Sequence, residues 1–328
     1  MTTLSPTASV PAVTRRARPW FRIIVSRVGG AIFVLWAVAT LSFFIIHLIP
    51  GDPALAIVGG GGTNVSEEVL TAARVEYGLD QPLAVQYVTQ LGRLVTGDLG
   101  TSYALKESVG TVITDHLGST LVLTAASLTL AWILALGLAL WVTNGGRIAR
   151  AVGSTLEVIG AAVPHFWLAA ILILVFAVNL RILPATTTPD ARGLVLPVIT
   201  LAIPLAGFLG QVMRESMLDA LESPFVFSAR ARGESEFGVR WIHAIRHAAL
   251  PGISLSGWAF GSLISGAVVV ETIFARPGLG RSLLSAVLSR DVPLVTGVLL
   301  TVAAVYIVVN ILAEIAYTLV DPRTRKLS

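Results

Sequence analysis

Residues 28–49 read VGGAIFVLWAVATLSFFIIHLI, a run of 22 residues without Asp, Glu, Lys or Arg. About 20 apolar residues, each rising 1.5 Å along a helix, suffice to cross the hydrocarbon core of a bilayer. In lipid only a helix satisfies the backbone hydrogen bonds of such a segment, unless strands close into a barrel, and this run lacks the alternation of barrel strands. The run therefore predicts a transmembrane helix.

Five further runs of at least 21 residues are equally free of these charges: Leu117–Val142, Val158–Leu180, Gly193–Met213, Ala248–Val270 and Val292–Ala313. Of the 328 residues, 55% are hydrophobic and 13% charged, whereas a soluble domain carries about a quarter charged residues. We therefore expect an all-α integral membrane protein. Its six transmembrane helices are predicted at about residues 23–49, 117–142, 156–180, 193–217, 251–272 and 292–319.

The basic residues predict the orientation of these helices. With the N-terminus in the cytoplasm, 15 of the 23 Lys and Arg residues fall on the cytoplasmic side, as the positive-inside rule requires. The long outer segment 50–116 then holds only Arg74, Arg93 and Lys106. We expect both termini to be cytoplasmic and residues 1–21 to form a disordered tail. The rule also explains the net charge of +4 without a nucleic-acid partner.

The outer segment carries helix signals of its own. Pro50-Gly51 ends the first membrane helix, and Asp52 can cap a helix whose first residue is Pro53. Residues 59–62 are all glycine and predict a flexible break. Asn64 and Glu67 then form a capping pair for a helix that closes near Gly78.

Leu83, Tyr87, Leu91 and Leu94 recur at helical spacing beyond Pro82 and give one apolar face. This spacing favours a small helical cap packed on the outer ends of the membrane helices. Direct contact with a substrate is the alternative.

Residues 218–250 form a cytoplasmic segment too long for a simple turn between antiparallel helices. Ser223-Pro224 predicts the start of a short helix, and Gly233 predicts its end. Ser235 can cap a second helix that runs through Trp241 to Pro251. The short helix presents aromatics and arginines, which suit either the groove of a partner protein or the anionic inner leaflet. Spacing alone leaves both interpretations open.

The motifs of this segment belong to an ordered series. SARARG (228–233) is followed by IHAIRHAALP (242–251), and the series also includes IPGDP (49–53), YGLDQP (77–82), GDLG (97–100), ETIF (271–274), PGLGR (277–281), RDVP (290–293) and DPR (321–323). In this order and spacing, from about Arg22 to Arg325, the chain resembles the first permease subunit of ABC importers of the dipeptide, oligopeptide and nickel class. The segment around 228–251 resembles the EAA loop of these permeases.

The resemblance implies a type I ABC importer permease fold with a helical extracytoplasmic segment, in a bacterial plasma (inner) membrane. It implies import of di- or oligopeptides with a second homologous permease, an extracytoplasmic substrate-binding protein and two ATPase subunits that bind ATP and Mg²⁺. It assigns contact with the ATPases to eight residues: Phe225, Phe227, Ser228, Ala229, Arg230, Ala231, Arg232 and Gly233. The name-giving Glu-Ala-Ala is Phe227-Ser228-Ala229 in this chain, a departure that affects which ATPase fits.

The chain lacks the sequence motifs that would let it power transport by itself. A phosphate-binding loop needs Gly-Lys-Ser/Thr, and the two lysines, Lys106 and Lys326, follow Leu105 and Arg325. Among the carboxylates, we expect only Glu314 to lie within a membrane helix, near its inner end and paired with a basic neighbour. The energy is then expected from separate ATPases. A stand-alone ion-coupled secondary transporter or channel is the alternative, and a receptor-like scaffold is a third reading.

Catalytic and metal chemistry find little support in the sequence. The chain has no cysteine, which removes disulfides and thiolate sites. Ser265 has no histidine on helix six to serve as a base. His243 and His247 are one turn apart, but the zinc-protease pattern is missing, so packing is favoured over a metal pair. We expect a non-catalytic subunit without a cofactor or metal of its own.

Small residues mark one face of helix five: Ser254, Gly257, Gly261 and Ser265. In lipid such a stripe favours close helix packing, and lining of the pathway or of a permease–permease interface is the alternative. Pro164, Pro197 and Pro204 are predicted to kink helices three and four.

Overall fold

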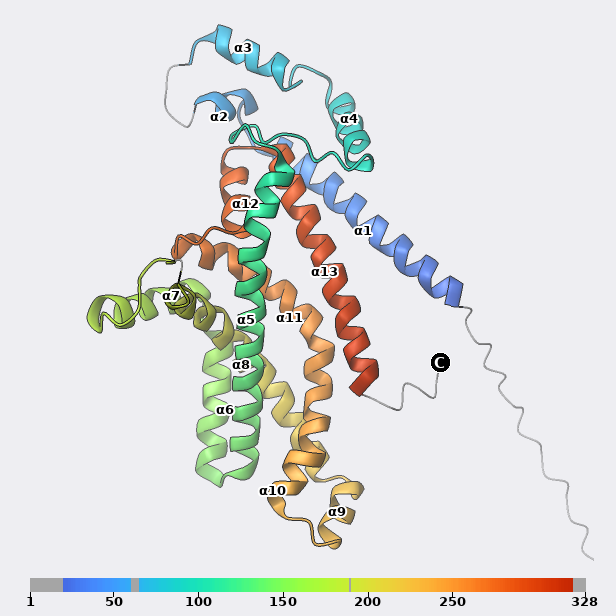
Figure 1. Cartoon of the computed structure of the whole chain (residues 1–328), viewed down its shortest axis with the longest axis vertical. Helices are drawn as coiled ribbons and strands as arrows, with labels where there is room; N and C mark the ends of the chain where they lie inside the picture. Colours follow the sequence, from blue (N-terminus) through green and yellow to red (C-terminus); the bar gives the residue numbers. More distant parts are fainter. Residues whose placement is uncertain (1–19, 60–64, 189, 321–328) are drawn as a thin grey trace, which may run out of the picture.

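The computed structural model describes residues 20–59, 65–188 and 190–320 (Figure 1). Within these ranges the chain is helical and contains no β-strand. Five described helices are long and apolar enough to cross a membrane. They are α1 (Trp20–Leu48), α5 (Val109–Asn144), α8 (Arg192–Leu221), α11 (Ile245–Ile273, preceded without a break by residues 236–244) and α13 (Val292–Val320). The predicted all-α membrane fold is confirmed.

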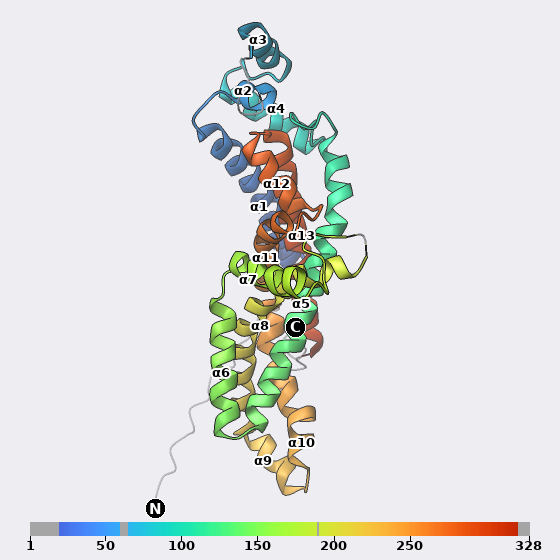
Figure 2. The same cartoon turned by 90° about the vertical axis from the view of Figure 1, so that its left-hand side faces the viewer.

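The sixth crossing is broken into two helices. α6 (Arg147–Ala162) meets α7 (His165–Leu172), which continues as a π-helix over Ile173–Asn179, at an angle of 105°. The predicted span over 156–180 is thus sharply bent, and the kink predicted at Pro164 is close to a right angle. A residue before proline is pushed out of the helical region, and Val163 has extended angles of φ −72° and ψ 123°. In Figure 2, α7 lies across the molecule above α6.

α5, α6 and α8 form the tightest part of the bundle and lie side by side in both views (Figures 1 and 2). Glycines permit this approach. A Cβ atom on Gly207 of α8 would lie 2.4 Å from the Ala161 amide nitrogen of α6. Pro197 and Pro204 lie inside α8, which continues to Leu221.

A second group of helices contains α1, α11, α12 (Leu279–Leu288) and α13. α13 packs against α11 on one side and α1 on the other. α1 leans away from the bundle towards its N-terminal end (Figure 1).

The segment between α1 and α5 forms a cap at one end of the molecule (Figure 1). We define the cap as α2 (Pro53–Gly59), α3 (Glu67–Glu76), α4 (Leu83–Val95) and the loop 96–108. Tyr87 of α4 contacts Phe43 and Phe44 of α1, and its hydroxyl lies 2.8 Å from the Thr40 hydroxyl. Tyr87 of the predicted apolar face thus packs on α1, whereas Leu83 of that face is 51% exposed and no residue of α4 is buried.

The helix starts in the cap follow local signals. The Asp52 carboxylate accepts a hydrogen bond of 2.9 Å from the Ala54 amide, which confirms the predicted cap of α2. α3 begins at Glu67 after Ser66, whose side chain makes no capping bond, and Asn64 of the predicted capping pair lies outside the described residues. So do Gly60–Gly62 of the predicted break, residues 1–19 of the predicted tail and the DPR motif.

An ion pair joins the two first helices of the cap. Arg74 of α3 contacts both Asp52, which caps α2, and Glu67 at 2.9 Å. The hydrogen bond from Arg74 is the main reason why the pKa of Asp52 is lowered. A lowered folded-state pKa gives stability that is present above the unfolded pKa of about 3.9 and is lost as the pH falls further.

We therefore expect acid to loosen α2 and α3. Amide hydrogen exchange over residues 53–59 and 67–76, followed by mass spectrometry, should be unchanged between pH 7 and 5 after correction for intrinsic rates. Protection should fall once the pH drops below about 4. In Arg74→Gln the protection should already be reduced at pH 7. An identical pH profile in wild type and variant would contradict this role of the pair.

Candidate functional site

The end of the molecule opposite the cap carries α9 (Pro224–Ala231), a short helix that projects beyond the bundle (Figure 1). It begins after Ser223 and ends in a turn at Gly233, whose φ of 83° lies in the left-handed region that glycine favours. α10 (Glu236–Gly238) follows, and the Ser235 hydroxyl accepts a hydrogen bond of 3.1 Å from the Gly238 amide. This bond confirms the predicted cap.

The helix after the turn does not stop at Pro251 as the sequence predicts. A π-helical turn over Val239–Ala244 leads directly into α11, and Pro251 lies inside that helix. A proline within a membrane helix is tolerated where neighbouring groups take up the freed carbonyl. α9 is therefore attached to a single helical rod of 38 residues, Glu236–Ile273.

α9 has a buried face and an exposed face. Val226 and Ala229 are buried against Val239. The Phe227 side chain on the other face is 76% exposed, and the Phe225 ring stacks on His247 at 4.7 Å. We call α9 together with Arg232 and Gly233 the knob. Its buried face fixes it to the chain, and its other face leaves Phe227, Ser228, Ala231, Arg232 and Gly233 exposed.

One ion pair joins the knob to the rod, a second lies within the rod, and a third ties the turn residue Glu234 to the rod. Arg230 of α9 contacts Glu236 at 2.7 Å, Arg240 contacts the same carboxylate at 3.0 Å, and His243 lies 2.9 Å from Glu234. His243 therefore faces a carboxylate. Across the described ranges, no three side chains of the metal-ligating types gather at one place.

The small-residue stripe of α11 is divided between two environments. A Cβ on Gly257 would lie 2.2 Å from the Asn310 amide oxygen of α13, and one on Gly261 would lie 3.0 Å from the Tyr306 ring. Ser265 and Gly261 also line a cavity of about 520 Å³ together with six other residues: His165, Trp258, Ser262, Gly266, Val269 and Tyr306. Ser254 is exposed. Packing within the chain and lining of a cavity thus coexist on one stripe.

The contact between Gly257 and Asn310 leads to a stability prediction. We expect Gly257→Ala to destabilise the protein by about 1 kcal/mol, because the added methyl group displaces the Asn310 side chain and its hydrogen bond to the Tyr306 carbonyl. Gly137→Ala in α5 is the matched control, since nothing lies within 4 Å of its added methyl group. Thermal midpoints in detergent, measured by the remaining monodisperse fraction after heating, should fall only for Gly257→Ala. Equal midpoints for both variants would contradict the close contact.

The sequence reasoning singled out only Glu314 among the carboxylates, although the predicted spans 156–180 and 251–272 also include Glu157 and Glu271. Glu157 of α6 and Glu271 of α11 are both fully buried. Glu157 accepts a hydrogen bond of 2.8 Å from Arg214 of α8, so a neutralised pair joins α6 to α8. Glu314 makes the predicted pair with a basic residue, Arg27 of α1, and this pair is exposed. The position of Glu157 directly before a charge-free run was the available signal.

Glu271 forms a hub between three helices. Its carboxylate accepts hydrogen bonds from the Thr120 hydroxyl of α5 at 2.6 Å and from the amides of Gly280 and Arg281 at 2.8 and 3.1 Å. The two amides belong to the first turn of α12, where a negative charge is favoured by the unpaired N–H groups and the helix dipole. The side chain thereby positions α12 against α11 and α5.

Arg290 and Asp291 connect the α12–α13 turn to the cap. Arg290 donates hydrogen bonds to the carbonyl oxygens of Pro50 and Gly51, just beyond α1. The buried Asp291 carboxylate accepts from the Ser102 hydroxyl and from the amide of Leu294 in the first turn of α13. These two neighbouring side chains fix the ends of α1 and α13 and the loop 96–108 to one another.

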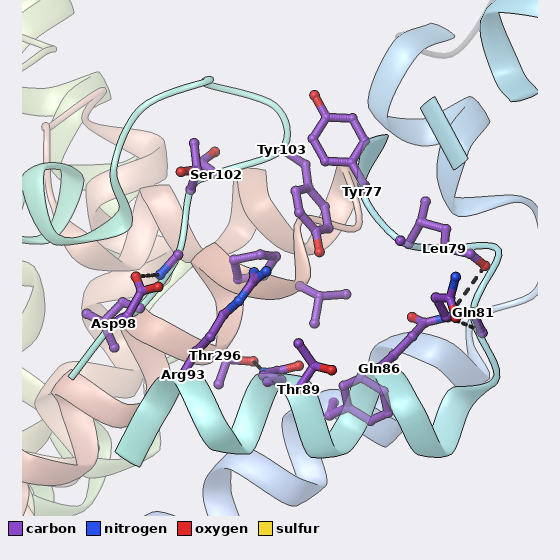
Figure 3. Close-up of a pocket in the computed structure, with 18 of the residues that line it drawn as sticks. Tyr77, Leu79, Gln81, Gln86, Thr89, Arg93, Asp98, Ser102, Tyr103 and Thr296 are labelled. Atoms are coloured by element: carbon purple, nitrogen blue, oxygen red, sulfur yellow. Dashed lines mark hydrogen bonds between the residues drawn. The ribbon is translucent and has the colours of Figure 1, made fainter. Parts of the chain in front are cut away.

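A cleft of about 840 Å³ lies between the cap and the ends of α1 and α13 (Figure 3). One wall is α4, another is the loop 96–108, and α13 contributes Val292, Pro293 and Thr296. Many of its lining side chains are polar or charged: His47, Glu76, Gln81, Gln86, Thr89, Gln90, Arg93, Asp98 and Lys106.

Five helices long and apolar enough to span a membrane, a bent sixth pair, a capped cleft at one end and an exposed helical knob at the other together describe a multi-pass membrane protein. The comparison with known proteins gives the family. Residues 127–326 match the family described as binding-protein-dependent transport system inner membrane component. Residues 20–124 match the N-terminal part of the membrane component of such systems. The chain belongs to this family and is a permease subunit of an ABC importer.

Similar proteins cover nearly the whole chain. A Brucella abortus (strain 2308) protein, provisionally named a peptide transport system permease protein, is 38% identical over 313 residues, which cover 92% of this chain and 98% of that protein. The glutathione transport system permease protein GsiC of Salmonella choleraesuis (strain SC-B67) is 34% identical over 305 residues, with the same coverage of 92% and 98%. A permease of this family works in a complex with an ATPase and a binding protein.

Proposed function

We propose that this chain is one of two permease subunits of an importer for short peptides, and that the knob receives the force of ATP hydrolysis from ATPase subunits. The observation that carries the proposal is the exposed face of α9, with Phe227 at its centre, on a helix whose other face is buried against the membrane-spanning rod. An exposed aromatic on a short projecting helix is the kind of anchor that fills a partner's pocket.

The proposed substrate class rests on the relatives. Two similar proteins have names that refer to peptide transport, and GsiC is named for glutathione, which is itself a tripeptide. The proposed partners are a second homologous permease, two ATPases that bind ATP and Mg²⁺, and an extracytoplasmic binding protein. This chain then supplies no catalytic group, cofactor or metal.

The proposed mechanism is alternating access. When ATP draws the ATPases together, they move the knobs of both permeases. Each knob moves its rod because the Arg230–Glu236 ion pair, the stacking of Phe225 on His247 and the packing of Val226 and Ala229 against Val239 join the two. The cavity lined by Gly261 and Ser265 would then be one side of a pathway that the second permease completes. Displacement of α11 would also move α13, because α13 packs against Gly257 and Gly261 of α11.

We further propose that the knob and both termini are cytoplasmic and that the cap lies outside, in a bacterial inner membrane. Because the chain has no cysteine, single cysteines can report the topology without background. Val95→Cys in the cap should react with a membrane-impermeant maleimide in intact spheroplasts. Arg232→Cys in the knob should react only after permeabilisation. The reverse pattern would invert the proposed orientation.

The function is tested by reconstitution. Proteoliposomes that contain both permeases and the ATPases should accumulate a labelled tripeptide when ATP and the binding protein are present. This chain alone, with a proton or sodium gradient and no ATPase, should move none. Gradient-driven uptake by the chain alone would instead support a secondary transporter.

A further inference from the structure

The cleft beneath the cap is a hollow with many polar and charged side chains in its walls. Its volume of about 840 Å³ falls within the range of small-molecule sites, about 300–1,000 Å³. Nothing in the mechanism proposed above uses it. The cleft therefore has the size of a ligand site, and its side chains indicate which ligand it could hold.

Two cations line the cleft without a carboxylate partner. No carboxylate oxygen of the described residues lies within 4.0 Å of the Arg93 guanidinium or the Lys106 ammonium. Arg93 extends from α4 into the cleft, and Tyr103 points into it from the opposite wall (Figure 3). A guanidinium that is left unpaired in a concave site is suited to bind a carboxylate through two parallel hydrogen bonds.

The backbone at Lys106 is held in an unusual conformation. Its φ of 59° lies in the left-handed region, which is uncommon for a residue with a side chain. The Lys106 amide donates to the Ser102 carbonyl at 3.1 Å, and its ammonium lies 4.3 Å from the centre of the Tyr77 ring. Backbone strain of this kind tends to be found at ligand sites. The turn thereby fixes the ammonium at the wall of the cleft.

The remaining polar groups suit a peptide backbone. Gln86 is already engaged, since its amide donates to the carbonyls of Gln81 and Leu79. The Gln90 amide donates to Thr296 at 2.9 Å, which leaves the Gln90 carbonyl oxygen as an acceptor for a peptide N–H. The Thr89 hydroxyl and the Tyr103 phenol also line the cleft. Burial, with Asp291 adding to it, raises the pKa of Tyr103, so the phenol stays a protonated donor at neutral pH.

We infer that the cleft is a binding site for a short peptide, held by its C-terminal carboxylate between Arg93 and Lys106. The inference rests on the proposed function, because it takes peptides as the transported solute. The site would hold the peptide after its release outside the membrane and before it enters the pathway. The hydrogen bonds of Asp291 to the loop 96–108 and to α13 hold this wall of the cleft in a fixed position relative to α13.

The test uses the full chain in nanodiscs, with Ala-Ala-Ala as the probe and titration calorimetry as the measurement. We expect saturable binding, and a Kd at least about tenfold higher for Ala-Ala-Ala-amide, because loss of charged hydrogen bonds to a carboxylate has an effect of this size. The double variant Arg93→Gln/Lys106→Gln should bind the acid and the amide equally weakly. Arg150→Gln, an exposed arginine of α6 remote from the cap, should bind like wild type.

Three results would overturn the inference. The first is equal affinity for the acid and the amide, and the second is unchanged affinity in the double variant. The third is an absence of saturable Ala-Ala-Ala binding, combined with a labelling result: the binding protein, and not the peptide, protects Arg93→Cys from maleimide. That combination would make the cleft a docking surface for the binding protein. If the proteoliposomes still import the tripeptide, each of these results overturns the binding site in the cleft and leaves the proposed function intact. If import fails while the peptide still binds in the cleft, only the proposed function is contradicted.

Discussion

Phe227→Asp is expected to lower the rate of ATP-driven uptake at least about tenfold, while the chain still inserts into the membrane and folds. The Phe227 side chain is 76% exposed and contributes nothing to the buried face formed by Val226 and Ala229. Hot-spot aromatics at interface centres carry about 2 kcal/mol or more, and a carboxylate placed in an apolar pocket adds a desolvation penalty. The measurement is tripeptide uptake in proteoliposomes, together with the amount of ATPase that copurifies with the permease.

The matched control is Val95→Asp, which places the same charge at an exposed apolar position of the cap. It should retain the ATPase and show normal thermal stability. Gly233 gives a second variant of the knob: Gly233→Val should also abolish uptake, whereas Gly233→Asn should retain more activity, because asparagine tolerates the φ of 83° better than a β-branched residue. Full uptake and normal copurification of the ATPase in Phe227→Asp would show that the knob contacts something else, the lipid surface included.

Glu271→Ala is expected to destabilise the protein by about 3–5 kcal/mol, because it removes the shared acceptor of three hydrogen-bond donors at once. The substitution leaves the Thr120 hydroxyl and the amides of Gly280 and Arg281 without their acceptor. Each buried donor left unpaired costs about 1–3 kcal/mol. The thermal midpoint of the purified chain in detergent is the measurement, and uptake should fall with it because α12 loses its position.

Conservative variants separate the roles of the hub. Thr120→Val removes one of the three hydrogen bonds to Glu271 and the acceptor of the Leu279 amide, and it should cause a smaller loss than Glu271→Ala. Glu68→Ala removes an exposed carboxylate of the cap and should leave the midpoint unchanged. If Glu271→Ala matched Glu68→Ala in stability, the hub would not hold α12 in place.

The membrane-spanning segments could be predicted from the sequence because hydrophobic length is a local property. A charge-free run such as Gly193–Met213 predicts a helix, because in lipid its backbone groups need hydrogen-bond partners within the segment. The same holds for signals that act within one turn. Asp52 caps α2 and Ser235 caps α10 as predicted, since donor and acceptor lie within three residues of each other.

Only the tertiary structure decided how distant residues meet. Pro164 predicts a bend, but the angle of 105° between α6 and α7 depends on how α7 packs across α8 and α11. Glu157 and Glu271 border charge-free runs, but their hydrogen-bond partners could not be predicted, because Arg214 and Thr120 lie 57 and 151 positions away in the sequence.

The sequence by itself determined an all-helical membrane protein with a cap at one end and a short helix beyond the other, because the length and periodicity of apolar runs act residue by residue. The tertiary structure decided which face of α9 stays exposed, which carboxylates are buried, and that Arg93 and Lys106 line one cleft without a carboxylate partner. The physical reason is that burial and pairing depend on contacts between segments far apart in the chain, and no periodicity within a segment encodes its neighbour.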